Sequence, residues 1–101
     1  WFNKSNALVD QGKYDKAIKA ADKAIEINSQ YAEAWFNKGL ALYHQGKYSE
    51  AIQAYDRAIE INPQLAEAWY NKGNALKLLG RTTEADAAFA KAGELGDNGA
   101  E

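Results

Sequence analysis

The sequence predicts an all-α protein made of three helical hairpins that stack side by side, with six helices in one domain. Three observations predict this fold: an internal repeat of constant length, apolar side chains at helical spacing inside each repeat, and turn-forming residues at matching places between the helical stretches. A single hairpin cannot bury both of its apolar stripes. Neighbouring hairpins must therefore cover each other.

The repeat appears in several residue columns at once. Its clearest markers are three evenly spaced tryptophans and three glycines with the same spacing: Trp1, Trp35 and Trp69, and Gly12, Gly46 and Gly80. Residues 1–31 match residues 35–65 at 20 of 31 positions, and residues 32–65 match residues 66–99 at 15 of 34. The chain therefore divides into three units, 1–31, 32–65 and 66–99, with a short tail.

Each unit contains two amphipathic stretches. In the second unit, the later stretch places apolar residues at i, i+1, i+4, i+7 and i+8, which is one stripe of a helix: Ala51, Ile52, Tyr55, Ala58 and Ile59. The earlier stretch has the helical spacing i, i+4, i+7 in Trp35, Gly39 and Leu42. We expect the first helices of the units near 1–11, 33–45 and 67–79, and the second helices near 15–27, 49–61 and 83–95.

Turn residues separate these stretches. We expect the left-handed backbone that follows a helix end at Gly12, Gly46 and Gly80. The N-caps of the second helices are expected at Asp15, Ser49 and Thr83. Asn28 and Asn62 are placed to close the second helices of the first two units, and Pro63 follows one of them. Small residues in the helices, such as Gly39 and Gly73, predict a close approach of the paired helices.

The composition excludes several classes of function. Twelve basic residues against 14 acidic ones give a net charge of −2, so the chain lacks the positive field that binds nucleic acids and anionic membranes. It has no cysteine for thiol or zinc–thiolate chemistry, and no apolar run long enough to cross a membrane. A lone histidine such as His44 is most often a solvated or groove-lining side chain. We therefore expect no enzyme activity, no catalytic residue, no metal and no cofactor.

The second unit carries the residues of a known repeat, in the order Trp35, Gly39, Leu42, Gly46, Tyr48, Ala51, Tyr55, Ala58 and Pro63. This pattern resembles the tetratricopeptide repeat, and the likeness covers essentially the whole chain. The family usually has a leucine before the first-helix glycine, whereas this chain has Lys4, Lys38 and Lys72. The first unit departs furthest, at Ser5, Ala21 and Ser29.

The resemblance implies a right-handed α-solenoid whose first helices line a concave groove. It also implies a cytoplasmic scaffold that holds a peptide or partner segment there. The groove residues that it implies are Phe2, Asn3, Asn6, Glu33, Phe36, Asn37, Leu40, Tyr43, His44, Glu67, Tyr70, Asn71, Asn74 and Lys77. Asparagine amides donate and accept hydrogen bonds, and aromatic rings supply apolar area, so this face suits an extended peptide. The alternative is that the asparagine column only braces neighbouring helices.

Charge narrows the expected partner. The face carries three acids and one base, which are Asp10, Glu33, Glu67 and Lys77. This balance favours a neutral to basic, partly apolar segment. Some members of the family grip a C-terminal carboxylate with lysine and arginine, but here Phe2, Glu67 and Asn71 stand at the positions of those cations. We therefore expect a partner other than a chaperone tail.

The ends of the array suggest a second function. In the third unit, Asp86 and Gly93 replace isoleucines of the earlier units, which blunts the face where a fourth unit would stack. The first unit begins at Trp1 without the Ala-Glu-Ala of the other units, and this leaves apolar area that a missing repeat would cover. Such an exposed end can pair with another chain. Self-association into a homo-oligomer is therefore the alternative to peptide binding.

Overall fold

The computed structural model describes residues 12–96, and this part of the chain is helical throughout. Its helices are α2 (Tyr14–Ile27), α3 (Ala32–His44), α4 (Tyr48–Ile61), α5 (Ala66–Leu78) and α6 (Thr82–Glu94), with no strand between residues 12 and 96. The helix predicted at 1–11 lies outside the described residues. The other five lie within one residue of their predicted bounds.

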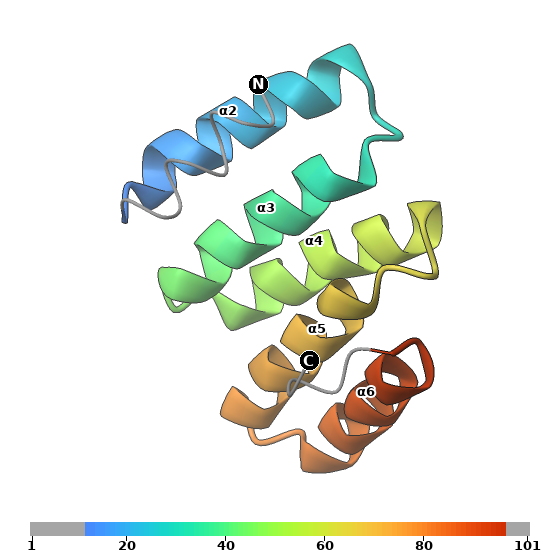
Figure 1. Cartoon of the computed structure of the whole chain (residues 1–101). Helices are drawn as coiled ribbons and strands as arrows, with labels where there is room; N and C mark the ends of the chain where they lie inside the picture. Colours follow the sequence, from blue (N-terminus) through green and yellow to red (C-terminus); the bar gives the residue numbers. More distant parts are fainter. Residues whose placement is uncertain (1–11, 97–101) are drawn as a thin grey trace.

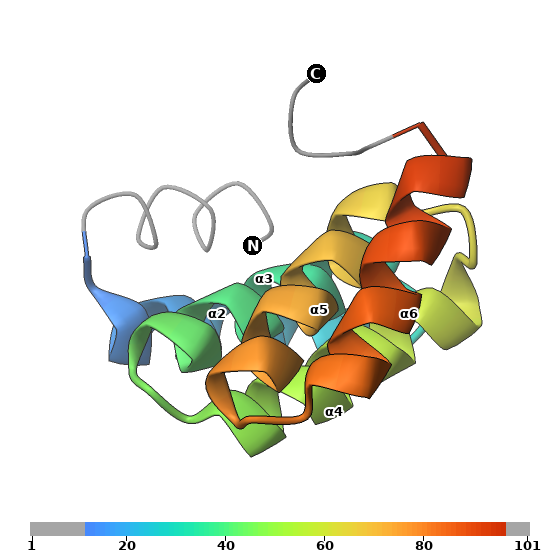
Figure 2. The same cartoon turned by 90° about the horizontal axis from the view of Figure 1, so that it is seen from below.

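The helices follow one another across the molecule in chain order, from α2 at the top of Figure 1 to α6 at the bottom. Helices α3 and α4 pack as one hairpin and α5 and α6 as the next, while α2 packs on α3 and α4 packs on α5. Helix α3 also touches α5 directly, and Figure 2 shows α4 below both of them. The two first helices α3 and α5 therefore lie next to each other on the same side of α4.

The turns confirm the role predicted for the glycines and correct the predicted N-caps. Gly12, Gly46 and Gly80 have φ values of +76°, +81° and +81°. The N-caps are Lys13, Lys47 and Arg81, without a side-chain cap, and not Asp15, Ser49 and Thr83. A left-handed glycine followed by one residue is enough to reverse the chain, so each second helix begins one residue earlier than predicted. The polar residues that the sequence suggests as caps then fall inside the first turn.

Asp15 has a different role. Its carboxylate accepts a hydrogen bond of 2.6 Å from Nε2 of Gln45, at the end of α3. The predicted closing residues of the second helices are correct, because Asn28 and Asn62 are the C-caps of α2 and α4. The side chain of each accepts a hydrogen bond from the backbone N–H two residues later, which turns the chain toward the next unit.

The paired helices approach closely at two glycines, as the sequence predicts. A Cβ on Gly39 would lie 2.6 Å from the Tyr55 ring, and a Cβ on Gly73 would lie 2.6 Å from the Phe89 ring. The alanine columns are also buried at these crossings, with Ala51, Ala58 and Ala75 fully buried. The sequence uses small residues so that a large aromatic ring of the second helix fits under the first helix.

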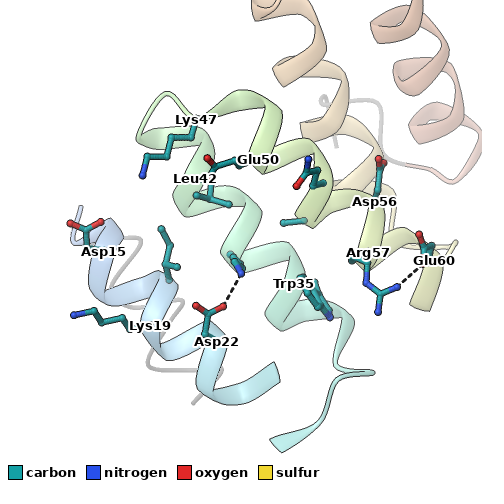
Figure 3. A pocket seen from close by; sticks show the side chains of 14 residues that line it. Asp15, Lys19, Asp22, Trp35, Leu42, Lys47, Glu50, Asp56, Arg57 and Glu60 are labelled. Carbon is teal, nitrogen blue, oxygen red and sulfur yellow. Dashed lines mark hydrogen bonds and ion pairs between the residues drawn. The ribbon is translucent and has the colours of Figure 1, made fainter. Parts of the chain in front are cut away.

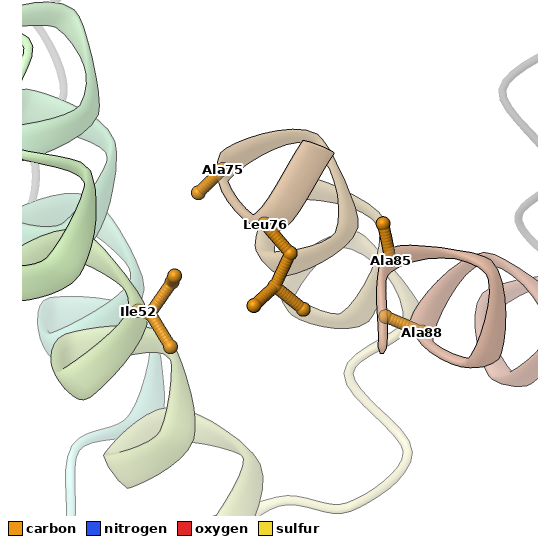
Figure 4. Close-up of a cluster of buried hydrophobic side chains, with 5 residues drawn as sticks. All are labelled: Ile52, Ala75, Leu76, Ala85 and Ala88. Atoms are coloured by element: carbon orange, nitrogen blue, oxygen red, sulfur yellow. The ribbon is translucent and has the colours of Figure 1, made fainter. Parts of the chain in front are cut away.

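The core between the second and third units is formed by α4, α5 and α6. Leu76 of α5 is 1% exposed and packs with Ile52 of α4 and with Ala85 and Ala88 of α6 (Figure 4). Trp69 and Phe89 pack against the edge of this cluster. The cluster fixes how α4 lies against the next hairpin, and thereby how α5 lies beside α3.

Ion pairs across the unit junctions explain why lysine replaces the family's leucine. Nζ of Lys38 lies 2.9 Å from Oδ1 of Asp22, and Nζ of Lys72 lies 2.7 Å from Oδ1 of Asp56. The two pairs occupy equivalent positions in successive repeats. Each lysine also lies over the tryptophan three residues earlier, at 5.5 Å and 5.4 Å from the ring centroid. The same contacts therefore join α2 to α3 and α4 to α5.

Candidate functional site

The face that the sequence assigns to a groove lies on α3 and α5 in the described part of the chain. Phe2, Asn3 and Asn6 lie outside the described residues. The remaining positions differ in exposure. The exposed ones are Glu33, His44, Glu67 and Lys77, the half-buried ones are Phe36, Leu40, Tyr43, Tyr70, Asn71 and Asn74, and the buried one is Asn37. We call these α3 and α5 residues the α3/α5 face.

Two aromatic pairs form the apolar part of this face. Phe36 of α3 packs on Tyr55 of α4 with ring centroids 5.8 Å apart, and Tyr70 of α5 packs on Phe89 of α6 at 5.5 Å. The second pair is the equivalent of the first in the next repeat. Sequence analysis placed Tyr55 in the apolar stripe of a helix and did not single out Phe89, although an aromatic residue at these equivalent positions was a usable signal. Each ring of the face thus rests on a ring from the second helix of its own unit.

Asn37 is the buried polar residue of this face. Its side chain is only 3% exposed, and its Nδ2 has no hydrogen-bond partner among the described residues. An unpaired buried donor costs about 1–3 kcal/mol. A residue that braced a neighbouring helix would hydrogen-bond to it, and the described residues provide no such bond to this amide. Packing around α3 covers most of Asn37.

Tyrosine hydroxyls gather where α3, α4 and α5 meet. Tyr43 packs edge-on against Tyr48 with centroids 5.4 Å apart. Burial raises the pKa of Tyr43 above its ordinary value, and the nearby Tyr48 and Tyr70 raise it further. Burial also raises the pKa of Tyr55, with a smaller contribution from Tyr43. The phenols of Tyr43 and Tyr55 therefore stay protonated and neutral near pH 7, so neither acts as a base.

The ionised groups of the α3/α5 face lie at opposite ends of its helices. Glu33 and Glu67 lie in the first turns of α3 and α5, and Lys77 lies in the last turn of α5. None of the three forms an ion pair within residues 12–96. Beside Lys77, the side chains of Tyr70, Asn74, Lys77 and Phe89 surround a hollow of about 320 Å³. This face therefore has free acids at one edge and a free cation at the other.

His44 has a packing role that the sequence did not reveal. Its ring stacks on Tyr14 of α2 with centroids 5.3 Å apart and an interplanar angle of 16°. It also meets the edge of the Tyr43 ring at 5.5 Å. Leu40 likewise packs toward α2, against Ala17 and Ala41. These two predicted groove residues thus contribute to the contact between α2 and α3.

The larger hollow of the described structure lies elsewhere, and sequence reasoning missed it. It measures about 1060 Å³ and is lined by α2, α3 and α4 (Figure 3). Its α3 residues are Trp35, Lys38 and Leu42, which belong to the tryptophan stripe and not to the α3/α5 face. Its walls hold two ion pairs, which are Lys38 with Asp22 and Arg57 with Glu60. The lining also includes the charged side chains of Asp15, Lys19, Lys47, Glu50 and Asp56, so acids and bases are nearly balanced around the hollow.

The part of the chain from residue 12 to residue 96 has no group of three or more potential metal-ligating side chains. It also contains no helix that is both long and apolar enough to span a bilayer.

Comparisons with known proteins agree with the repeat architecture. A model of the tetratricopeptide repeat family matches residues 2–66, and a second model of that repeat matches residues 54–87. No curated protein matches the chain.

Solved structures resemble the chain closely in fold. The second TPR of Spaghetti (RPAP3), bound to the HSP90 peptide SRMEEVD, is 27% identical with a TM-score of 0.89, over 92% of this chain and 86% of that one. The first TPR of the same protein, bound to the same peptide, is 26% identical with a TM-score of 0.92, over 97% and 78%. MamA is 33% identical with a TM-score of 0.85, over 90% of this chain and 53% of MamA. Because the first family model alone covers more than half of the sequence, the chain belongs to the tetratricopeptide repeat family.

Proposed function

We propose that the chain is a protein-interaction scaffold that binds an extended peptide or partner segment on the α3/α5 face. The observation that carries the proposal is the Asn37 amide, which is buried on this face without a hydrogen-bond partner in the described residues. A backbone carbonyl of a bound segment would satisfy that donor once the side chains that cover it move aside. The Phe36 and Tyr70 rings supply apolar area on the same face, since both are only half-buried.

The similar structures support this proposal. Both TPR domains of Spaghetti are bound to a peptide, and each shares about a quarter of its residues with this chain. The partner in our proposal is a neutral to basic, partly apolar segment. Glu33 and Glu67 support this chemistry because both are exposed and free of ion pairs in the described part of the chain.

In this proposal the whole chain acts as one domain of three repeats, 1–31, 32–65 and 66–99. Its six helices would form a right-handed solenoid with the first helices on the concave side. The ion pairs Asp22–Lys38 and Asp56–Lys72 support a regular array, because the two described junctions use the same contact. The position of the third unit that is equivalent to Asp22 and Asp56 is Ala90. The third unit thus lacks the acid at this one position.

The alternative, self-association through the repeat ends, finds less support at the C-terminal end. The outer side of α6 exposes Asp86, Ala87, Ala90 and Gly93. These small or charged residues provide little apolar area to cover, so we place the interaction on the α3/α5 face.

A peptide selection with matched variants tests the proposal. Random peptides displayed on phage are selected against the chain, and the affinity of enriched peptides is then measured for Phe36→Ala and Asn37→Ala. We expect each variant to weaken binding about tenfold, because Asn37→Ala removes one hydrogen bond between neutral groups and Phe36→Ala removes one ring contact. Lys19→Ala and Glu50→Ala, in the larger hollow of Figure 3, serve as controls. Peptides whose affinity depends on the controls and not on Phe36 or Asn37 would overturn the proposal.

A further inference from the structure

The hollow beside Lys77 lies in the third unit. It is lined by the half-buried Tyr70 and Asn74, by the exposed Lys77 and by Phe89, and measures about 320 Å³. The equivalent residues of the second unit are Phe36, Leu40, Tyr43 and Tyr55. The aromatic pair is therefore retained between the two units, and the two remaining positions change from apolar or aromatic to polar.

The packing at these two positions differs between the units. In the second unit, Leu40 packs against the Ala17 and Ala41 cluster, and Tyr43 packs against the cores on both sides of α4. Both side chains fill space between neighbouring helices. In the third unit, Asn74 and Lys77 stand at these positions, and neither belongs to a described core cluster. Asn74 and Lys77 instead line the hollow together with Tyr70 and Phe89.

The free charge of Lys77 sets this lysine apart from the others on α3 and α5. Lys38 and Lys72 are each held by an aspartate, at 2.9 Å and 2.7 Å. Lys77 forms no ion pair with any described residue. Its neighbours around the hollow add hydrogen-bond donors, because Asn74 has an amide N–H₂ and Tyr70 a hydroxyl.

The lining of the hollow thus combines the cation of Lys77, two neutral hydrogen-bond donors and the apolar ring of Phe89. A carboxylate on a short apolar stem matches this set, since its oxygens accept hydrogen bonds and its methylene groups contact a ring. A cationic side chain would meet the uncompensated charge of Lys77. An apolar side chain would leave the donors of Asn74 and Tyr70 without acceptors.

The position of Glu67 adds a distance requirement. Glu67 is ten residues before Lys77 on α5, which places the two Cα atoms about 15 Å apart along the helix. An extended chain covers this distance in about four to five residues. A partner segment whose basic residue meets Glu67 therefore needs its acidic residue four to five positions away to reach Lys77.

We propose that the hollow of Tyr70, Asn74, Lys77 and Phe89 is a subsite for an aspartate or glutamate side chain of the partner segment, spaced four to five residues from a basic residue that meets Glu67. The subsite rests on the proposed function, because it assumes a segment bound along the α3/α5 face. It adds one acidic position to a partner that is otherwise neutral to basic.

Selections from one random peptide library, displayed on phage, test the subsite. The library is selected separately on the wild-type chain, on Lys77→Gln, on Lys77→Glu and on the control Lys19→Glu, an exposed lysine of the larger hollow. We expect wild type and the control to enrich an acid at one position and a base four to five residues from it. Lys77→Gln loses the acid preference, and Lys77→Glu replaces it with lysine or arginine. For one enriched peptide, changing its acid to the amide weakens binding to wild type about fivefold and leaves binding to Lys77→Gln unchanged.

The outcomes separate this inference from the proposed function. Enriched peptides that depend on Phe36 and Asn37, with no acid preference that responds to Lys77, would overturn the subsite and leave the proposed function in place. An acid preference that persists in Lys77→Glu would also overturn the subsite. Enriched peptides that are insensitive to Phe36, Asn37 and Lys77 alike would overturn both proposals.

Discussion

The carboxylate of Asp22 on α2 and the ammonium of Lys38 on α3 lie 2.9 Å apart, and the same contact recurs in the next repeat between Asp56 and Lys72. Both residues of the first pair are partly exposed, with 47% and 28% of their side chains accessible. The family's leucine at this position would add apolar contact but no directional bond. The ion pair instead fixes which residue of one unit meets which residue of the next.

A double-mutant cycle on this pair measures that contribution. We expect Asp22→Ala and Lys38→Ala to show a coupling of about 0.5 kcal/mol in the free energy of unfolding, because partly exposed pairs are screened by solvent. The coupling should shrink in high salt. The pair Lys91–Glu94, at 3.8 Å and more exposed, is the control and should show less coupling. Equal coupling in the two pairs would contradict a role for Asp22 and Lys38 in joining the units.

The close approach at Gly39 predicts a large effect of a single methyl group. In Gly39→Ala the new Cβ would lie 2.6 Å from the Tyr55 ring and 3.1 Å from the backbone oxygen of Ala51, so the helices must separate. We expect a loss of about 1–3 kcal/mol in urea unfolding. Gly93→Ala is the matched control, because nothing lies within 4 Å of its Cβ and Gly93 is inside α6. That variant should gain about 0.5–1 kcal/mol, and a comparable loss in both variants would count against the predicted clash.

The buried hydroxyl of Tyr55 predicts a pH-dependent stability. Tyr55 is fully buried, its hydroxyl has no hydrogen-bond partner in the described residues, and burial raises its pKa. Because the folded chain then holds this proton more tightly than the unfolded chain, stability is constant below about pH 10 and falls as the pH rises above it.

Replacing this hydroxyl should remove part of that fall. We expect Tyr55→Phe to be as stable as wild type or more stable at pH 7, and to lose less stability than wild type between pH 9 and about 11 in urea titrations. Tyr14→Phe, at a half-buried ring, is the control. A Tyr55→Phe curve parallel to that of wild type would show that the proton of Tyr55 is not linked to folding.

The residues of the α3/α5 face predict that peptide affinity does not depend on a free C-terminal carboxylate of the peptide. Glu67 and Asn71 stand on α5 where the resemblance implies cations that grip a C-terminal carboxylate. We expect the peptide SRMEEVD with a free carboxylate and the same peptide with an amidated end to bind within about twofold of each other in calorimetry. A free-acid peptide that binds more than tenfold tighter would mean that other cations of the chain supply such a grip.

Local signals predicted most of this fold. The glycine turns and the asparagine C-caps follow from backbone preferences of single residues, and the helices follow from apolar spacing that any hairpin of this length must satisfy. The predicted N-caps were wrong because Asp15, Ser49 and Thr83 have capping side chains but stand two residues after the observed N-caps, Lys13, Lys47 and Arg81. Their side chains found other surroundings, as the bond from Gln45 to Asp15 shows.

The site was less predictable because it depends on packing between distant residues. The repeat places Phe36 and Tyr70 at equivalent positions. The burial of Asn37, and the packing of these two rings on Tyr55 and Phe89, depend on the assembled hairpins. The hollow at Lys77 is lined in part by positions 74 and 77, where the third unit differs from the second. The hollow of Figure 3 arises where α2 and α4 flank α3, a relation that no single stretch of sequence contains.

The central claim is that the α3/α5 face, and not the larger hollow on the tryptophan stripe, is the working surface. NMR titration of the ¹⁵N-labelled chain with a peptide from the selection tests it most directly. The side-chain amides of Asn37 and Asn74 report on the α3/α5 face. The Trp35 indole N–H, which donates to the backbone oxygen of Ser29, reports on the larger hollow. The account predicts that the Asn37 and Asn74 resonances shift on binding, that the Trp35 indole stays in place, and that Asn37→Ala weakens binding about tenfold without loss of stability. Shifts confined to the Trp35 indole and its neighbours, with Asn37 and Asn74 unmoved, would contradict it.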